Sequence, residues 1–417
     1  MPTDQTFAIV GAGLAGAKAA EALREEGFDG RLVLLGAEAE RPYERPPLSK
    51  EYLRGEAERE TAYVHPAAFY GDHEIDLRVG DSVVGLDPGR RELALAAGEP
   101  LAYDRLLLAT GAEPRRLSIL GSELDGIHYL RTFADSDAIR SRFDAGGRLV
   151  VIGAGWIGSE VAASARMRGM DVTVIAPGSV PFQRVLGTEV GAIYRDIHLD
   201  HGVEMLLGTG VASFEGGARV ERVRTQDGRA IDCDAVVVGI GATPRAILAA
   251  TAGLTVGNGI LVDGRLETTV PGIFAAGDVA DQLHPRLGRL RVEHWDNALH
   301  QGPAAARSML GSDEPYARTP YFFSDQYDVG MEYSGHATGW DRVVFRGDPA
   351  SREFIAFWLL NDRVLAGMNV NVWDVVEPIQ ALIASDIPVD ERRLSDPDVP
   401  LTELIANDQA AVGEVAS

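Results

Sequence analysis

Residues 7–16 read FAIVGAGLAG, and residues 149–158 read LVVIGAGWIG. In each copy an apolar segment leads into the pattern GxGxxG and then into an alanine-rich segment. This order predicts a buried strand, a glycine-rich turn and a helix, and the two helices should span about residues 14–25 and 157–168. A second apolar segment follows each helix, so the chain contains two β-α-β units and we expect an α/β fold.

The three glycines of each turn have different steric roles. The first permits a tight turn, the second lets the backbone approach a pyrophosphate, and the third lets the helix pack closely on its strand. They are Gly11, Gly13 and Gly16 in the first copy, and Gly153, Gly155 and Gly158 in the second. A phosphate placed there meets free N–H groups at the positive end of the helix. One such pattern can be only a turn, but two copies in the same context indicate two Rossmann-like dinucleotide-binding domains.

Three further apolar segments end in glycine-rich turns. DRLLLATGAEP (104–114) and CDAVVVGIGATPR (233–245) suit crossings of the chain between the two nucleotide-binding domains. GIFAAGDVA (272–280) contains Gly277 and Asp278, and an aspartate there can reach a ligand hydroxyl or cap a helix.

The C-terminal part of the chain has a different residue pattern. From about residue 320 aromatic residues alternate as in antiparallel strands, and a helix should follow over about 375–385. The expected domains are a first nucleotide-binding domain over 1–113 and 245–320, a second over 114–244, and an α+β C-terminal domain over 321–417. Pro303 lies in an otherwise helical stretch, where we expect a break or kink.

Composition excludes several classes of protein. The net charge of −23 argues against a binder of nucleic acid or of anionic membranes, since both need a basic face. No apolar run approaches the length of a membrane span, and the N-terminal residues lack the basic region of a signal peptide. Cys233 is the only cysteine, which suits a reducing cytoplasm. The histidines show no metal-binding spacing, so we expect no metal site, and no GxSxG nucleophile motif is present.

Three segments carry a more specific resemblance: RPYERPPLSK (41–50), EHWDNALHQG (293–302) and SDQYD (324–328). With the glycine-rich turns, they resemble the FAD-dependent ferredoxin reductases of the putidaredoxin reductase, rhodocoxin reductase and biphenyl dioxygenase reductase-component family. The resemblance implies FAD in the first domain, NADH in the second, and an iron–sulfur ferredoxin that serves a cytochrome P450 or a ring-hydroxylating, Rieske-type oxygenase. Two alternatives stay open, an NADH oxidase that uses O2 and a redox interaction protein similar to apoptosis-inducing factor.

Position by position, the resemblance implies two sets of cofactor contacts. The FAD contacts fall on Gly11, Gly13, Leu14, Ala15, Gly16, Glu38, Arg45, Lys50, Val83, Ala109, Thr110, Gly111, Arg131, Gly277, Asp278 and Trp295. The contacts of the nicotinamide nucleotide fall on Gly153, Gly155, Trp156, Ile157, Glu160, Arg184, Gly239, Ile240 and Gly241. Without the resemblance, Arg45 would be a solvated arginine, Trp295 a packing residue and Val83 an ordinary strand residue.

Lys50 ends the proline-rich segment, and Glu160 lies near the start of the second predicted helix. An acid at a helix start is by itself favoured by the helix macrodipole. The resemblance instead implies that Lys50 and Glu160 pair beside the nicotinamide, and that Trp295 lies beside the flavin on the ferredoxin side. These are the expected catalytic residues. A unit charge about 4 Å away in a medium of effective dielectric about 20 is worth roughly 4 kcal/mol, so Lys50 is able to tune a flavin potential.

The expected electron path follows from the cysteine content. Residues 1–120 contain no cysteine, whereas disulfide reductases of the resembled superfamily need a redox pair there. Electrons should therefore leave directly from the flavin, and Cys233 should be an inert thiol. Arg286, Arg289 and Arg291 form a basic cluster in this acidic chain, which is either a docking patch for an acidic ferredoxin or a solvated loop.

The second nucleotide fold leaves the choice of nicotinamide open. NAD-specific folds usually carry an acid at the end of the second strand, where it binds the ribose 2′-OH. Here the run IAPGSVPFQR (175–184) has Ala176 at that place and no acid, with Arg184 nearby. We expect NADH, and NADPH is not excluded.

Overall fold

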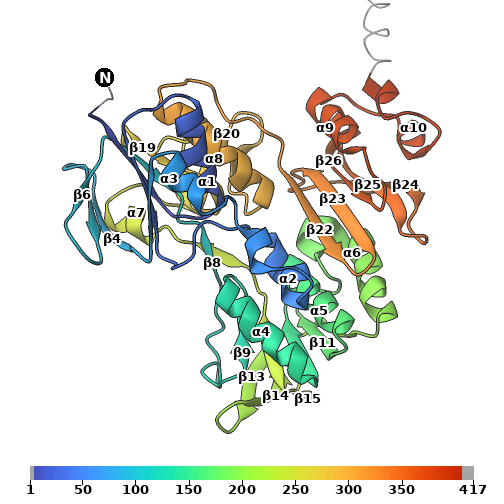
Figure 1. The fold of residues 1–417 in the computed structure, drawn as a ribbon. Helices are drawn as coiled ribbons and strands as arrows, with labels where there is room; N and C mark the ends of the chain where they lie inside the picture. Colours follow the sequence, from blue (N-terminus) through green and yellow to red (C-terminus); the bar gives the residue numbers. More distant parts are fainter. Residues whose placement is uncertain (1–3, 406–417) are drawn as a thin grey trace, which may run out of the picture. The chain divides into compact units, whose positions relative to one another are not determined.

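The computed structural model describes residues 4–405, which fold into two compact units (Figure 1). The described segments are 4–46, 58–113 and 242–318 in the first unit, and 47–57, 114–241 and 319–405 in the second. Residues 1–3 and 406–417, which the expected domain boundaries include, lie outside the described residues.

The first unit is built on a parallel sheet of five strands in the order β19-β7-β1-β2-β3. The strands are β1 (Thr6–Val10), β2 (Arg31–Gly36), β3 (Ile75–Val79), β7 (Arg105–Leu108) and β19 (Ile273–Ala275). Helix α1 (Leu14–Glu25) connects β1 to β2 and spans the residues expected from the sequence. It packs on α8 (Trp295–Met309), and alanines of both helices join the core of the sheet.

Helix α8 runs through Pro303, so the break expected there is absent. The proline removes one backbone hydrogen bond of the helix. Packing on α1 compensates, and Gly302 makes that packing close, because a Cβ at this position would lie 2.3 Å from the carbonyl oxygen of Ala15. Tertiary packing thus overrides the local signal.

Smaller elements complete the first unit. The strands β4 (Val83–Asp87), β5 (Glu92–Leu95) and β6 (Leu101–Ala102) form one three-stranded sheet, and β18 (Ile260–Val262), β20 (Ala280–His284) and β21 (Gly288–Leu290) form another. The short helical segments are η2 (Arg59–Ala62), α3 (Ala68–Asp72), α7 (Ile247–Thr251) and η3 (Gly277–Val279). The short strands β8 (Ala112–Pro114) and β17 (Ala242–Pro244) lie where the chain leaves and re-enters this unit.

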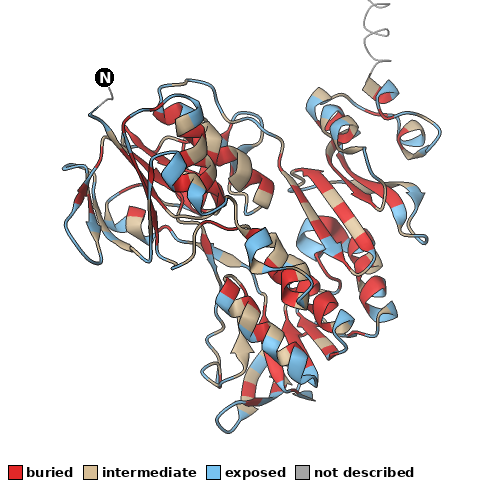
Figure 2. Cartoon of the chain, in the orientation of Figure 1, coloured by how far each residue is buried: buried red, intermediate tan, exposed pale blue. Residues whose placement is uncertain are grey.

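The second unit carries the second glycine-rich turn on a parallel sheet in the order β12-β11-β10-β16-β9. The strands are β9 (Ile127–His128), β10 (Arg148–Ile152), β11 (Asp171–Ala176), β12 (Glu204–Leu207) and β16 (Ala235–Val238). The helical segments are η1 (Pro46–Ser49), which begins at the unit boundary, α2 (Glu51–Arg54), α4 (Phe133–Ala145), α5 (Trp156–Met167) and α6 (Gln183–Asp200). Helix α5 follows β10 and is buried from Gly158 to Ala165 (Figure 2). The two parallel sheets confirm the α/β fold expected from the two GxGxxG copies.

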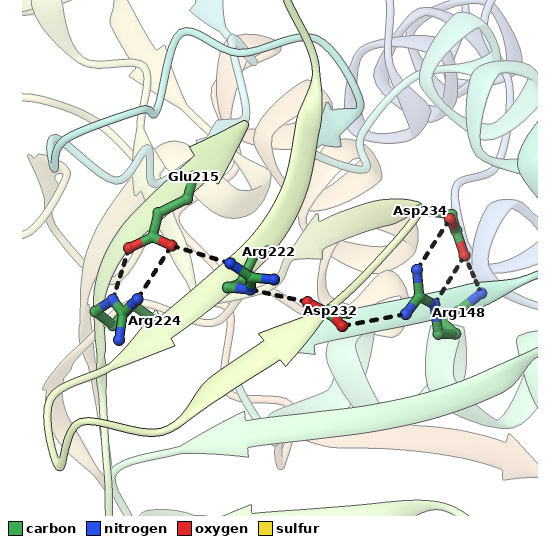
Figure 3. Close-up of polar contacts among 6 residues, drawn as sticks. All are labelled: Arg148, Glu215, Arg222, Arg224, Asp232 and Asp234. Atoms are coloured by element: carbon green, nitrogen blue, oxygen red, sulfur yellow. Dashed lines mark hydrogen bonds and ion pairs between the residues drawn. The ribbon is translucent and has the colours of Figure 1, made fainter. Parts of the chain in front are cut away.

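A three-stranded antiparallel sheet in the second unit carries a row of surface ion pairs. Its strands are β13 (Val211–Gly216), β14 (Val220–Thr225) and β15 (Ala230–Asp232). Figure 3 shows the row, which continues onto β10; we call it the exposed ladder, and it consists of Arg148, Glu215, Arg222, Arg224, Asp232 and Asp234. Its side chains are between 35% and 52% exposed.

An antiparallel sheet in the order β22-β23-β26-β25-β24 completes the second unit. The strands are β22 (Tyr321–Gln326), β23 (Val329–Gly335), β24 (Arg342–Asp348), β25 (Glu353–Leu360) and β26 (Arg363–Val370). One face, with Phe354 and Trp358, packs on α6, and the other, with Phe357, packs on α9 (Val376–Ser385) and α10 (Glu391–Ser395). The expected antiparallel strands and helix are confirmed. Although we expect a separate domain over 321–417, its described part shares a core with α6.

Candidate functional site

The first glycine-rich turn connects β1 to α1. Gly11 has φ +116°, and a Cβ there would lie 2.1 Å from the carbonyl oxygen of Ala109. A Cβ on Gly16 would lie 2.0 Å from the carbonyl oxygen of Gly11, so packing within the protein requires glycine at both positions. Gly13 differs, since a Cβ there would meet no atom within 4 Å apart from its chain neighbours. The backbone at Gly13 therefore borders open space, as the approach of a pyrophosphate requires.

The second glycine-rich turn repeats this geometry between β10 and α5. Gly153 has φ +103°, and a Cβ there would lie 2.2 Å from the carbonyl oxygen of Gly239. A Cβ on Gly158 would lie 2.1 Å from the carbonyl oxygen of Gly153. A Cβ on Gly155 would again meet no atom within 4 Å apart from its chain neighbours. The two turns thus share one steric design.

Helices α1 and α5 both begin without a side-chain cap. Their N-cap residues, Gly13 and Gly155, have no side chain to satisfy the first backbone N–H groups, and the positive end of each helix dipole lies at the same place. At the second turn Ile157 and Ile240 are 42% and 36% exposed, which leaves apolar surface beside it. The backbone donors, the dipole and the open space fit the phosphates of a dinucleotide cofactor at each turn.

Two more turns lie at the carboxyl edge of the first unit's sheet. After β7, the Thr110 hydroxyl donates to the carbonyl of Arg245 at 2.7 Å, and the Arg245 N–H donates to the carbonyl of Gly111 at 2.9 Å. After β19, Gly277 has φ +76°, and a Cβ there would lie 3.1 Å from the Cβ of Ala15 at the start of α1. Asp278 therefore follows a turn that touches the first glycine-rich turn. Open α/β sheets bind ligands at this edge.

Glu38, Tyr43 and Arg45 form a half-buried polar cluster in the first unit. Arg45 Nη2 lies 2.8 Å from Glu38 Oε1, and the Tyr43 hydroxyl donates to Glu38 Oε2 at 2.5 Å. Burial alone would raise the pKa of Glu38, but Arg45 and the Tyr43 hydroxyl outweigh it, so the pKa is lowered. The sequence predicts separate ligand roles for Glu38 and Arg45, and the structure joins them in one ion pair. Val83, the predicted adenine contact, lies half-buried at the start of β4.

Lys50 and Glu160 form the ion pair expected from the sequence. Lys50 Nζ lies 2.9 Å from Glu160 Oε2, and the two side chains are only 7% and 5% exposed. The Ser49 hydroxyl donates to Glu160 Oε2 at 2.5 Å, and the Ser324 hydroxyl donates to Glu160 Oε1 at 2.7 Å. Both carboxylate oxygens therefore have partners, and the buried ammonium has a counter-ion.

The segment that carries Lys50 is anchored within the second unit. Residues 47–57 belong to that unit, so the chain passes from one unit to the other between two adjacent prolines. The Ser136 hydroxyl donates to the carbonyl of Leu48 at 2.9 Å, and the Ser164 hydroxyl donates to the carbonyl of Ser49 at 2.7 Å. Helix α4 thus binds the carbonyl before Ser49 and helix α5 binds the carbonyl of Ser49 itself, which fixes the backbone that leads into Lys50.

Strand β22 contributes side chains to the ion pair and to the second glycine-rich turn. The ring of Phe322 packs edge-on against Trp156, with ring centroids 4.8 Å apart. The Lys50 ammonium lies 5.7 Å from the centroid of the Phe323 ring. Because Ser324 bonds to Glu160 as well, three consecutive residues of β22 contact predicted site residues.

In the second nucleotide-binding fold, no acidic residue follows the end of strand β11 until Glu189. Trp156 stacks on Phe182, with ring centroids 4.1 Å apart. Strand β11 ends at Ala176, which is buried, and Arg184 is exposed at the start of α6. The next carboxylate along the chain is that of Glu189. No side chain between Ala176 and Glu189 is therefore able to accept a hydrogen bond from the ribose as a carboxylate would.

Trp295 and Arg131 lie in different units. Trp295 is the first residue of α8 in the first unit, where burial raises the pKa of Glu44 and the neighbouring Trp295 side chain opposes that shift. Arg131 precedes α4 in the second unit, and its N–H donates to Asp135 Oδ2 at 3.1 Å.

The three arginines of the basic cluster are not equivalent. Arg286, in the turn after β20, and Arg289, within β21, are both exposed, although Arg289 Nη1 donates to the carbonyl of Asp281 at 2.7 Å. The Arg291 side chain is only 7% exposed, pairs with Glu293 at 2.5 Å and donates to the carbonyl of Asp278 at 2.9 Å. The charge of Arg291 is therefore engaged within the protein, so the exposed charge of the cluster comes from Arg286 and Arg289.

Cys233 is buried, and burial raises the pKa of its thiol to about 12, which disfavours the reactive thiolate. Among residues 4–405, no group of three or more histidine, cysteine and acidic side chains is arranged to hold a metal ion. Within the same residues, no helix combines the length and the hydropathy needed to cross a membrane.

Sequence reasoning missed Ser49, Ser324 and Tyr43 as parts of the site. Tyr43 and Ser49 lie in the same proline-rich segment as Arg45 and Lys50, so proximity in the sequence was a signal. Ser324 begins SDQYD, but no pattern links it to a carboxylate 164 positions earlier.

Comparison with known proteins places these features in context. Residues 5–302 match the family described as pyridine nucleotide-disulphide oxidoreductase, and residues 321–405 match the reductase C-terminal family. The chain is similar to rhodocoxin reductase of Rhodococcus erythropolis, with 39% identity over 403 residues that cover 96% of this chain and 94% of the relative. It is 41% identical over 404 residues to the anthranilate 1,2-dioxygenase system ferredoxin–NAD(+) reductase component of Burkholderia cepacia, covering 95% and 98%. A chain of the covalent putidaredoxin reductase–putidaredoxin complex matches with a TM-score of 0.92 at 37% identity, covering 98% of this chain and 100% of that chain.

Proposed function

Because the chain belongs to the pyridine nucleotide-disulphide oxidoreductase family, we propose that it is an FAD-dependent ferredoxin reductase. When bound, FAD accepts a hydride from NADH and releases its electrons singly to an iron–sulfur ferredoxin, which serves a cytochrome P450 or a ring-hydroxylating oxygenase. The observation that carries the proposal is the pair of glycine-rich turns, each with an open middle glycine and an uncapped helix. The names of relatives that match almost the whole chain support a ferredoxin as the acceptor.

We assign FAD to the domain of residues 1–113 and 245–320 and the nicotinamide nucleotide to residues 114–244, with a C-terminal domain over 321–417. In the first domain the backbone at Gly13 and the start of α1 bind the pyrophosphate, and Asp278 binds a hydroxyl of the cofactor. A reducing cytoplasm suits the single thiol of the chain, and we place the protein there.

We assign Lys50 and Glu160 to the reacting end of the two cofactors. A fixed ammonium stabilises negative charge that arrives on a reacting ring, and it does so most strongly where water is excluded. The Glu160 carboxylate, 2.9 Å from Lys50 Nζ, supplies the counter-charge that makes burial of the ammonium tolerable. We assign Trp295 to the flavin on the side from which electrons leave.

The test of this function is NADH-driven reduction of purified iron–sulfur ferredoxins by the FAD-loaded protein. We expect ferredoxin reduction to be much faster than NADH consumption without ferredoxin. Stoichiometric peroxide formed from NADH and O2 at the same rate would instead identify an NADH oxidase. A long-lived reduced state that hardly turns over ferredoxin would identify a redox interaction protein.

The ferredoxin docks, in this proposal, on the hairpin between β20 and β21. Arg286 and Arg289 are exposed there beside Leu283, which is 50% exposed, so the hairpin offers positive charge next to apolar surface. Ferredoxin-dependent turnover at low ferredoxin concentration should fall as salt rises from about 0.05 M to about 0.5 M. A rate that stays flat over this range would remove the hairpin as an electrostatic docking site.

We propose NADH as the electron donor, with weak discrimination against NADPH. The weak discrimination is supported by Ala176 at the end of β11, because NAD-specific folds usually carry an acid at that place, where it binds the ribose 2′-OH. The Ala176→Glu variant should raise the ratio of kcat/KM for NADH over that for NADPH roughly tenfold or more, because a carboxylate binds the hydroxyl and repels the 2′-phosphate. An unchanged ratio would mean that another residue sets the preference.

A further inference from the structure

Ser324 begins the motif SDQYD on β22, and it is 1% exposed. Its hydroxyl donates to Glu160 Oε1 at 2.7 Å. The side-chain N–H of Gln326, two residues later, donates to the same Ser324 oxygen at 3.2 Å. Because a hydroxyl carries one proton and Gln326 already acts as the donor on the other side, the proton of Ser324 is directed to Glu160.

The carboxylate of Glu160 is held at both ends. Lys50 and Ser49 bind Oε2, and Ser324 binds Oε1. The terminal torsion of a glutamate is broad, so a carboxylate bound at one oxygen can rotate about its last carbon–carbon bond. Bonds to both oxygens, from two different parts of the chain, remove that freedom.

We infer that Ser324 is a positioning residue for hydride transfer: it fixes the Glu160 carboxylate so that the Lys50 ammonium keeps one place. The inference rests on the proposed function, in which Lys50 stabilises charge on the reacting ring. Ser49 holds the other oxygen from the segment at 47–57. Strand β22 therefore supplies the orientation of a charged group, and small errors in such orientation can lower a rate severely.

The experiment compares three single variants of the FAD-loaded protein. Ser324→Ala removes the donor, and Ser324→Thr keeps a hydroxyl. The matched control is Ser334→Ala, because Ser334 is 2% exposed on the adjacent strand β23 and bonds to Gln380, not to Glu160. Flavin reduction at saturating NADH is followed by stopped-flow absorbance. Binding of oxidised NAD+, which involves no turnover, is followed by titration.

We expect Ser324→Ala to slow flavin reduction about tenfold while the Kd for NAD+ stays within about twofold, since loss of a hydrogen bond to a charged group acts on the barrier. Ser324→Thr should recover most of the rate, and Ser334→Ala should change neither quantity. Equal losses in rate and NAD+ affinity, or an equal loss in Ser334→Ala, would show a merely structural role and overturn the inference.

Non-additivity gives a second test. If Ser324 acts through Glu160, then Ser324→Ala should cause no further loss in a Glu160→Ala background. A further loss there would overturn the inference. If Glu160→Ala does not fold, the rates of flavin reduction in the single variants decide. A rate that Ser324→Thr recovers while Ser334→Ala stays normal supports the inference, and a rate that Ser324→Thr does not recover overturns it.

The unsubstituted protein separates this inference from the function on which it rests. If NADH does not reduce its flavin, the proposed function fails and the role of Ser324 falls with it. If NADH reduces its flavin normally and Ser324→Ala is equally fast, only the role of Ser324 is overturned.

Discussion

The second unit contains two charged networks that differ in burial. The buried cluster consists of Ser49, Lys50, Glu160 and Ser324, and the side chains of its ion pair are 7% and 5% exposed. The side chains of the exposed ladder are between 35% and 52% exposed (Figure 3). The distances are alike, since Lys50 Nζ lies 2.9 Å from Glu160 Oε2 and Arg222 Nε lies 2.8 Å from Asp232 Oδ1. Distance alone therefore does not tell the two networks apart.

Solvent makes the difference between the two networks. Ion pairs at a surface contribute about 0–1 kcal/mol, because water screens the attraction and the side chains lose entropy. A buried pair gains more attraction but must first lose its hydration, so its net contribution is small while the loss of one partner costs about 3–5 kcal/mol. Stability therefore does not explain why this chain has a lysine and a glutamate in its interior. The proposed role of Lys50 in hydride transfer does explain it.

The largest effect should follow from breaking the buried pair on one side only. Glu160→Gln removes the carboxylate that lies 2.9 Å from the buried Lys50 ammonium, so the free energy of unfolding should fall by about 3–5 kcal/mol. Lys50→Met/Glu160→Gln removes both charges and should restore most of that loss. Urea unfolding of the single and double variants measures both effects. A double variant as unstable as Glu160→Gln would mean that packing around the glutamate, rather than charge, causes the loss.

The same variants separate stability from function. Lys50→Met should retain FAD and yet reduce it slowly with NADH, because the charge beside the reacting ring is gone. The double variant should not recover the rate, although it recovers stability. Stopped-flow reduction at saturating NADH tests this, and a normal rate in Lys50→Met would return the lysine to a structural role.

How far the sequence predicts this site depends on how local each signal is. The glycine-rich turns follow from sterics within about ten residues, and the α1 bounds and the strained glycines agree with them. Only the family resemblance predicts the pairing of Lys50 with Glu160. The role of Ser324 was not predictable, because it depends on how the C-terminal sheet packs on α5. The burial of Arg291 within the basic cluster was not predictable for the same kind of reason, since burial of a side chain is a tertiary property.

His198 extends the comparison to a buried group that titrates. It is fully buried on α6, with Nδ1 3.0 Å from the Tyr327 hydroxyl, and burial lowers its pKa from the ordinary 6.5 to about 4. Between these values the unfolded chain binds more protons than the folded one, so stability should fall as pH falls from about 6.5 to about 4, by up to roughly 3 kcal/mol. In the ladder, by contrast, hydrogen bonds from Arg148 hold the pKa of the Asp234 carboxyl below its ordinary value, which favours its charged form.

A His198→Gln variant tests this pH dependence. Its thermal midpoint should vary less between pH 7 and pH 4.5 than that of the unsubstituted protein, because the titrating ring is gone. If the variant loses as much stability on acidification as the unsubstituted protein, then groups other than His198 cause the loss.

A smaller effect should come from the half-buried cluster of the first unit. Tyr43→Phe removes the hydroxyl that donates to Glu38 Oε2, and the free energy of unfolding should fall by about 1 kcal/mol. Tyr103→Phe is the matched control, since the Tyr103 hydroxyl is buried and has no hydrogen-bond partner among the described residues. That change should be neutral or slightly stabilising. Equal losses in both variants would mean that the hydroxyl's volume, not its hydrogen bond, matters.

The smallest effect should come from the exposed ladder. Asp232 bridges Arg222 and Arg148, so Asp232→Asn removes two of the ladder's ion pairs at once. We still expect a loss of less than about 1 kcal/mol, and it should shrink further as salt rises from about 0.1 M to about 1 M, where the screening length falls from about 10 Å to about 3 Å. Urea unfolding at both salt concentrations measures it. A loss above about 2 kcal/mol that salt leaves unchanged would break the comparison, because the ladder would then behave as a buried network in spite of its exposure.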